Sequence, residues 1–200
     1  RRCPRMRGRC AFAVAAIVMF VAVGGLAIGC GQSARAPIGE RPVEVVATTN
    51  FLADMAREIG GPRTRVSSLM GPGVDPHSYK ASASDVKTLR DADLLLNVGL
   101  QLEGRMGDWF EEMSRRTMVV SVTSDIPRGD LLASPDYEDQ YVPHVWFDVP
   151  MWSSAVGTIE RALTRADPAG AREYAARADE YRRRLRALDR EARSALAAIP

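Results

Sequence analysis

The sequence predicts an α/β fold, with a lobe built on a parallel sheet and one long helix after it. Short β-branched or apolar segments alternate with helix-forming segments, which is typical of right-handed β-α-β units. One of these segments, 92–98, contains three consecutive leucines, as expected of a strand with helices covering both faces of its sheet. From 167 to 198, apolar residues recur every three or four positions, which is the spacing of an amphipathic helix.

The first β-α unit is predicted to begin at residue 43. Residues 43–48 (VEVVAT) are rich in β-branched side chains and predict a strand. A helix is predicted from about 51 to 59, and Gly60-Gly61 would end it, because glycine commonly follows a helix. Residues 64–70 predict a second strand, which the segment 71–73 (GPG) interrupts.

The next elements follow the same order. Ser82 and Asp85 have the spacing of a capping box, so a helix is predicted to begin there and to end near residue 91. A third strand is predicted at 92–98, a largely helical segment at 101–116 and a fourth strand at 117–122. The long helix would then begin at Asp167-Pro168, a good N-cap and first-turn pair. At 1.5 Å per residue it would be roughly 45 Å long, which is more than one lobe needs, and a coiled-coil helix is the alternative.

The first thirty residues differ from the rest. Five arginines precede an uncharged run from 11 to 28, which ends at Gly29-Cys30, and "LAIGC" resembles a bacterial lipoprotein box. We expect residues 1–30 to be a lipoprotein signal peptide with the lipid on Cys30, and 31–42 to be a tether. A transmembrane helix is the alternative, since this run is only just long enough to span a bilayer.

Composition limits the chemistry. The chain is 46% hydrophobic with a net charge of +2, so it can bury a core and shows no basic surface for a nucleic acid partner. All three cysteines lie within residues 1–30, so a metal site in the body would need His, Asp or Glu. The sequence also contains no G-x-S-x-G, P-loop or H-E-x-x-H motif.

The only two histidines, His77 and His144, are the candidate metal ligands. Each follows a proline in a loop after a predicted strand, and such loops gather at one edge of an open parallel sheet. Imidazole is the commonest metal ligand, although packed core histidines remain the alternative. Asp75 and Asp148 lie close to the histidines and could orient the imidazoles, while Asp148 could equally cap the helix after it.

Three segments carry a family resemblance: "VVATTNFLADMAREIGG", "LMGPGVDPHSYKASASDVKTLRDADLLLNVGLQLEGRM" and "PHVWFDVPMW". They resemble the metal-binding solute-binding lipoproteins of bacterial zinc/manganese ABC transporters, from about residue 43 to 200. The resemblance implies two lobes joined by a rigid helix, with 43–166 as the N-terminal metal-binding lobe and 167–198 as the connecting helix. It also implies that His77 and His144 bind the metal, and that a Glu or His and an Asp come from a second lobe. We expect that C-terminal lobe to be absent, so the chain would be a fragment or a truncated gene product.

The resemblance further implies a carrier without enzymatic activity, anchored by lipid to the outer face of the cell membrane, that delivers a divalent ion to an ABC permease and its ATPase. The segment 124–142 lacks the histidine-rich loop typical of zinc carriers, so Mn²⁺ is favoured over Zn²⁺, with Fe²⁺ also possible. Two alternatives remain. One is a metal-dependent hydrolase that uses the two histidines, with Asp75 as its base. The other is a surface adhesin or structural lipoprotein in which the histidines are only packed.

Overall fold

The structure, a computed structural model, describes residues 35–135 and 137–199. The expected signal peptide and Cys30 lie outside the described residues. Within these two ranges, none of the helices combines the length and the apolar character that a membrane span requires.

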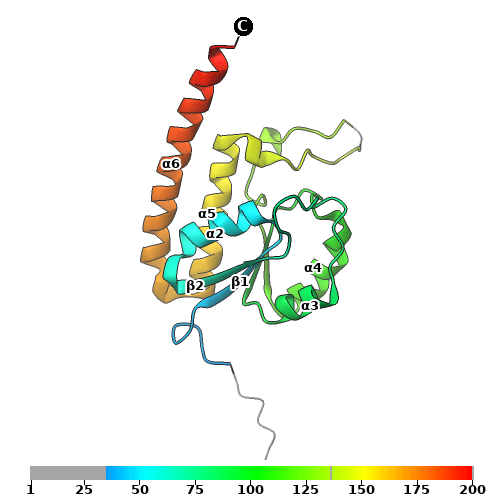
Figure 1. Ribbon diagram of the computed structural model, residues 1–200, viewed down its shortest axis with the longest axis vertical. Helices are drawn as coiled ribbons and strands as arrows, with labels where there is room; N and C mark the ends of the chain where they lie inside the picture. The colour runs from blue at the N-terminus through cyan, green and yellow to red at the C-terminus, as the bar shows by residue number, and fades with distance from the viewer. Residues whose placement is uncertain (1–34, 136, 200) are drawn as a thin grey trace, which may run out of the picture. The chain divides into compact units, whose positions relative to one another are not determined.

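Four parallel strands form the central sheet, which confirms the predicted fold class (Figure 1). Their order in the sheet is β2-β1-β3-β4, so the chain adds a strand on one side of β1 and then continues on the other. In register, Val45 lies between Val66 and Leu94. The strands are β1 (Val43–Ala47), β2 (Thr64–Ser68), β3 (Leu94–Asn97) and β4 (Met118–Ser121).

Helices cover both faces of this sheet (Figure 1). On one face lie α2 (Asn50–Gly60), α5 (Val149–Ala166) and α6 (Ala171–Ala197), and on the other lie α3 (Ala83–Arg90) and α4 (Gly107–Ser114). Short 3-10 turns connect several elements: Gly61–Arg63, Gly104–Met106, Arg128–Asp130, Val145–Phe147 and Pro168–Gly170.

The three leucines of β3 explain why this strand reads as a continuous apolar segment. Leu94 and Leu96 belong to the larger core, against α2, α5 and α6, whereas Leu95 belongs to a smaller core with Leu89 of α3. All three β3 leucines are fully buried. Successive side chains of a strand point to opposite faces, so this strand contributes to both cores.

Two predicted helix boundaries are confirmed closely. Gly61 follows α2 with a φ of +56°, a left-handed conformation that glycine adopts without strain. Ser82 and Asp85 form the predicted capping box at the start of α3. The predicted helix at 101–116 begins later than expected, because Leu100 and Gln101 have positive φ values and α4 starts only at Gly107.

The long helix also begins differently from the prediction. Asp167 makes no side-chain capping bond to the next turn, and the chain forms a 3-10 turn at Pro168–Gly170 before α6 starts. The Asp167 carboxylate instead accepts hydrogen bonds from Arg63, at 2.7 and 3.0 Å, and from the Tyr174 hydroxyl at 2.8 Å. This contact ties the corner between α5 and α6 to the turn that precedes β2.

Candidate metal centre

The loop that carries His77 leaves the carboxyl end of β2, at the edge of the sheet where the sequence places the site. Its first residues are fixed to β1, because the amides of Leu69 and Met70 donate to the carbonyls of Ala47 and Thr48 at 3.0 and 2.9 Å. At its far end, the Tyr79 hydroxyl donates to the Asp85 carboxylate at 2.8 Å. The loop is therefore held at both ends, between β1 and the start of α3.

Asp75 binds the turn around His77. Its carboxylate accepts the backbone N–H of His77 at 3.0 Å and the Ser78 hydroxyl at 2.8 Å. The Ser78 hydroxyl and, after it, the His77 amide lower the pKa of Asp75 below its usual value. Asp75 thus orients His77 through the backbone, and these hydrogen bonds do not involve the imidazole.

His144 lies at the start of the Val145–Phe147 turn, just before α5. Val145 is buried, which anchors the turn in the core, while the His144 side chain is exposed. Asp148 accepts the amide of Met151 at 2.8 Å and is the N-cap of α5. Of the two roles that the sequence leaves open for Asp148, the structure therefore shows helix capping.

The structure brings the two histidines together, although they are 67 residues apart in sequence. Their Nε2 atoms lie 3.1 Å apart, and their ring planes meet at 68°. A zinc ion holds imidazole nitrogens at about 2.0–2.1 Å, so two of them in a tetrahedral shell lie about 3.3 Å apart. The observed spacing suits one shared ion, and it also suits an N–H···N hydrogen bond between two neutral rings.

Aromatic side chains pack against His144. Its ring makes a T-shaped contact with Trp146, with ring centroids 5.2 Å apart at 89°. The ring centroid of Trp146 lies 4.7 Å from that of Phe51, which belongs to the first turn of α2. Trp146 is partly buried and packs against the larger core, whereas its neighbour Phe147 is 81% exposed.

Glu103 is a buried residue that the sequence analysis did not single out. It is 2% exposed, and its carboxylate accepts the Thr48 hydroxyl at 2.5 Å and the Val98 amide at 2.9 Å. It thereby joins the ends of β1 and β3, and the Thr48 carbonyl also holds the start of the His77 loop. The available signal was a single acidic residue that follows the apolar third strand by a few positions, which is weak evidence in a sequence alone.

In the described chain, the candidate site consists of the two imidazoles, without a third His, Cys, Asp or Glu side chain placed to share an ion with them. Among residues 35–135 and 137–199, no group of three or more His, Cys, Asp or Glu side chains gathers where it could hold a metal ion. Two nitrogen ligands leave the remaining coordination positions of a divalent ion to water or to further protein groups.

Comparisons with known proteins agree on one family. A family model described as zinc-uptake complex component A, periplasmic, matches residues 45–200. The chain is 40% identical over 172 residues to the manganese-binding lipoprotein MntA of Bacillus subtilis (strain 168), covering 86% of this chain and 56% of that protein. It is 38% identical over 156 residues to the zinc-binding protein TroA of Treponema pallidum (strain Nichols), covering 78% of this chain and 50% of that protein.

Solved structures agree with the sequence comparisons. The periplasmic zinc-binding protein TroA from Treponema pallidum matches with a TM-score of 0.76 and 37% identity, over 80% of this chain and 57% of that chain. The chain thus spans about half the length of the relatives it matches.

Proposed function

Because the chain belongs to the family of the periplasmic component A of zinc-uptake complexes, we propose that it captures a divalent transition-metal ion outside the cytoplasmic membrane. It would hand that ion to the permease of an ABC transporter, which a cytoplasmic ATPase drives. The similar proteins named above are named for metal binding, and their names describe no catalytic activity.

The observation that carries this proposal is the convergence of the His77 and His144 Nε2 atoms at 3.1 Å. Both side chains are exposed, so an ion from solvent can reach them. Histidines that were only packed in the core would be buried instead. The hydrolase alternative finds less support, because the Asp75 carboxylate is engaged with Ser78 and the loop backbone.

The remaining ligands are assigned to a second lobe, in the part of the relatives' length that this chain does not span. On this proposal residues 43–166 are the N-terminal lobe and 167–198 the connecting helix. The exposure of Leu188 and Leu196 on α6, 52% and 65%, supports a second lobe that packs against the end of that helix. A Glu or His and an Asp from that lobe would complete the coordination of the ion.

Manganese is the proposed ion, with zinc next and iron possible. Similar proteins are named for manganese and for zinc, so the names alone do not decide. The segment 124–142 contains no histidine, and "HVWFDVPMW" resembles the manganese-type branch. A site of two nitrogens and two carboxylates would suit Mn²⁺ or Fe²⁺, whereas more nitrogen ligands would favour Zn²⁺.

The proposed location is the outer face of the cell membrane, with Cys30 carrying the lipid anchor. The support is the lipoprotein-like sequence around Cys30 and the name lipoprotein borne by several relatives. Mass spectrometry of the protein purified from membranes tests this, because a lipid on Cys30 would appear as a diacylglyceryl mass on the N-terminal peptide. A Cys30→Ala variant that still partitions into membranes would contradict it.

Metal titration tests the main proposal. Isothermal titration of the purified protein with Mn²⁺ and Zn²⁺ should show one saturable site, and His77→Ala and His144→Ala should each weaken it by about tenfold or more. Glu111→Ala removes an exposed carboxylate from α4 and serves as the control. If both histidine variants bind as tightly as the unmodified protein, the carrier proposal is lost, and turnover of a phosphoester would favour the hydrolase instead.

A further inference from the structure

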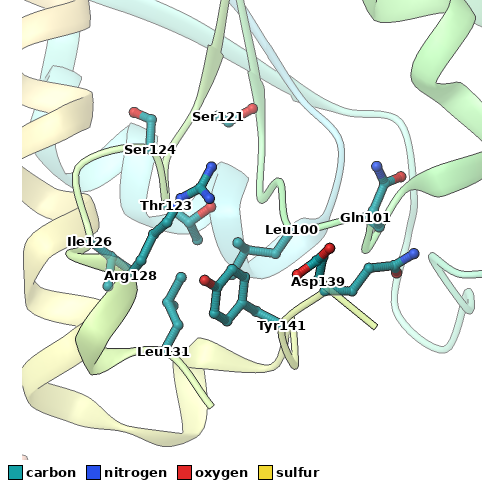
Figure 2. Close-up of a pocket in the computed structure, with 11 residues that line it drawn as sticks. Leu100, Gln101, Ser121, Thr123, Ser124, Ile126, Arg128, Leu131, Asp139 and Tyr141 are labelled. Atoms are coloured by element: carbon teal, nitrogen blue, oxygen red, sulfur yellow. The ribbon is translucent and has the colours of Figure 1, made fainter. Parts of the chain in front are cut away.

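A cavity lies at the carboxyl ends of β3 and β4, and neither histidine belongs to its lining (Figure 2). Its volume is about 350 Å³, which is within the range of sites for small molecules. One wall comes from the turn after β3, another from the turn after β4, and the third from residues 128–131 and 139–141. Open parallel sheets bind ligands at this edge.

Unusual backbone conformations concentrate around this cavity. Within the described chain, three non-glycine residues have positive φ values: Leu100 at 52°, Gln101 at 63° and Asp139 at 58°. All three line the cavity, although Asp139 comes from a different segment of the chain. Such conformations are costly for residues with a Cβ, and they cluster where a ligand is held.

The cavity also carries two opposite charges, on Arg128 and Asp139. Both side chains are exposed, and among the described residues neither forms an ion pair or a side-chain hydrogen bond. In the view of Figure 2, the Tyr141 ring and Leu100 lie between Arg128 on one side and Asp139 on the other. The lining thus offers a cation and an anion with an apolar surface between them.

We propose that this cavity binds a small zwitterion with an apolar body, which is the chemistry of a free amino acid. Arg128 pairs with the ligand carboxylate, as a guanidinium can through two parallel hydrogen bonds. Asp139 pairs with the ammonium group, and the Tyr141 ring, Leu100 and Leu131 contact the side chain. This site goes beyond metal capture, because it uses none of the residues assigned to the metal.

Titration with free amino acids tests the proposal. Isothermal titration of the purified protein in chelator-treated buffer uses L-alanine, L-leucine and L-methionine as probes. At least one should bind saturably, and for leucine two analogues remove one charge each: 4-methylpentanoate lacks the ammonium and isoamylamine lacks the carboxylate. Each analogue of a binding amino acid should bind about tenfold more weakly or worse.

Two variants then assign the charges. Arg128→Gln and Asp139→Asn should each weaken the binding by about tenfold. Asparagine tolerates the positive φ at position 139, so this variant removes the charge without disturbing the backbone. Arg90→Gln, an exposed arginine on α3, and His144→Ala should leave amino acid binding unchanged.

Three outcomes would overturn the proposal: no saturable binding of any of the three amino acids, equal binding of a singly charged analogue, or unchanged binding in both charge variants. His77→Ala and His144→Ala report on the metal site alone. Failure of the amino acid site and failure of the proposed metal transport are therefore distinguished by separate variants.

Discussion

The Asp75 carboxylate controls the backbone of His77, because it accepts the His77 amide at 3.0 Å and the Ser78 hydroxyl at 2.8 Å. Both bonds require the ionised carboxylate or an equivalent acceptor. Without them, His77 would sample more orientations, and an ion would have to order the loop when it binds. For the proposed metal site, the ligand geometry would therefore be partly prepared before an ion binds.

We expect Asp75→Ala to weaken metal binding by roughly threefold to tenfold, since the lost hydrogen bonds leave the His77 turn free to move. Asp75→Asn keeps an amide oxygen that can accept the His77 N–H, so its affinity should lie between those of Asp75→Ala and the unmodified protein. Isothermal titration with Mn²⁺ measures the affinities. Equal affinity for Asp75→Ala and the unmodified protein would show that the turn is held by other contacts.

The sequence was sufficient to name the two histidines but not their surroundings. The meeting of His77 and His144 was predictable, because both follow prolines in loops that come after strands and therefore gather at the same sheet edge. Asp148 was left between two roles, since capping and ring orientation require the same residue at the same position. Glu103 was missed because its partner Thr48 is 55 residues away, and only the folded chain brings the two together.

At the level of elements, the corner between α5 and α6 depends on an ion pair whose carboxylate is buried and whose guanidinium is partly exposed. Asp167 is 4% exposed and accepts hydrogen bonds from Arg63 and from the fully buried Tyr174. The Arg63 guanidinium lowers the pKa of Asp167, and although burial opposes this effect, the Tyr174 hydroxyl adds to it. Burial and the Asp167 carboxylate raise the pKa of Tyr174 to about 12, so its hydroxyl remains a donor at neutral pH.

Asp167→Asn should lower the free energy of unfolding at pH 7 by roughly 2 kcal/mol, because it removes the charged acceptor of the Arg63 and Tyr174 hydrogen bonds, while Arg63, which is 27% exposed, keeps its contact with Glu173 at 3.6 Å. The pKa of Asp167 is depressed in the folded state, so its stabilisation is complete above the unfolded value of about 3.9 and is lost as pH falls below it. The gap between the two proteins should therefore narrow from about pH 5 to pH 3. Urea unfolding at several pH values measures this.

Asp179→Asn is the matched control for Asp167→Asn. Asp179 also pairs with an arginine, Arg182, but its side chain is 64% exposed. Exposed pairs contribute about 1 kcal/mol or less, so this variant should remain close to the unmodified protein. A gap for Asp167→Asn that stays constant through the acid range would mean that its carboxylate does not titrate with folding.

The strands were more predictable than the turns between them. β-branched and leucine-rich segments indicated the four strands, because a strand that is buried on one or both faces of its sheet needs such side chains. The turn after β3 could not be foreseen, since Leu100 and Gln101 carry no signal for the positive φ values they adopt. Only Gly99, with a φ of 88°, marks that place in the sequence, and the predicted helix consequently began too early.

On the scale of the whole molecule, the two ends of α6 differ in their packing. Tyr174 and Ala178 are fully buried against the larger core and Leu185 is 9% exposed, whereas Leu188 is 52% and Leu196 65% exposed. The apolar stripe of α6 thus continues past the part of the helix that packs against the larger core. An apolar stripe of this kind favours association with another surface, and another copy of the chain can provide one.

We therefore expect the purified chain to form dimers or larger species with rising concentration. The double variant Leu188→Glu with Leu196→Glu should remain monomeric, because two charges on the stripe oppose its burial. Arg190→Glu is the matched control: it also changes the net charge by −2, since one positive charge becomes negative, at an exposed position off the stripe. Sedimentation velocity should show self-association for the unmodified protein and for Arg190→Glu. A single monomeric species for the unmodified protein at every concentration would mean that the exposed leucines of α6 do not drive contacts between chains.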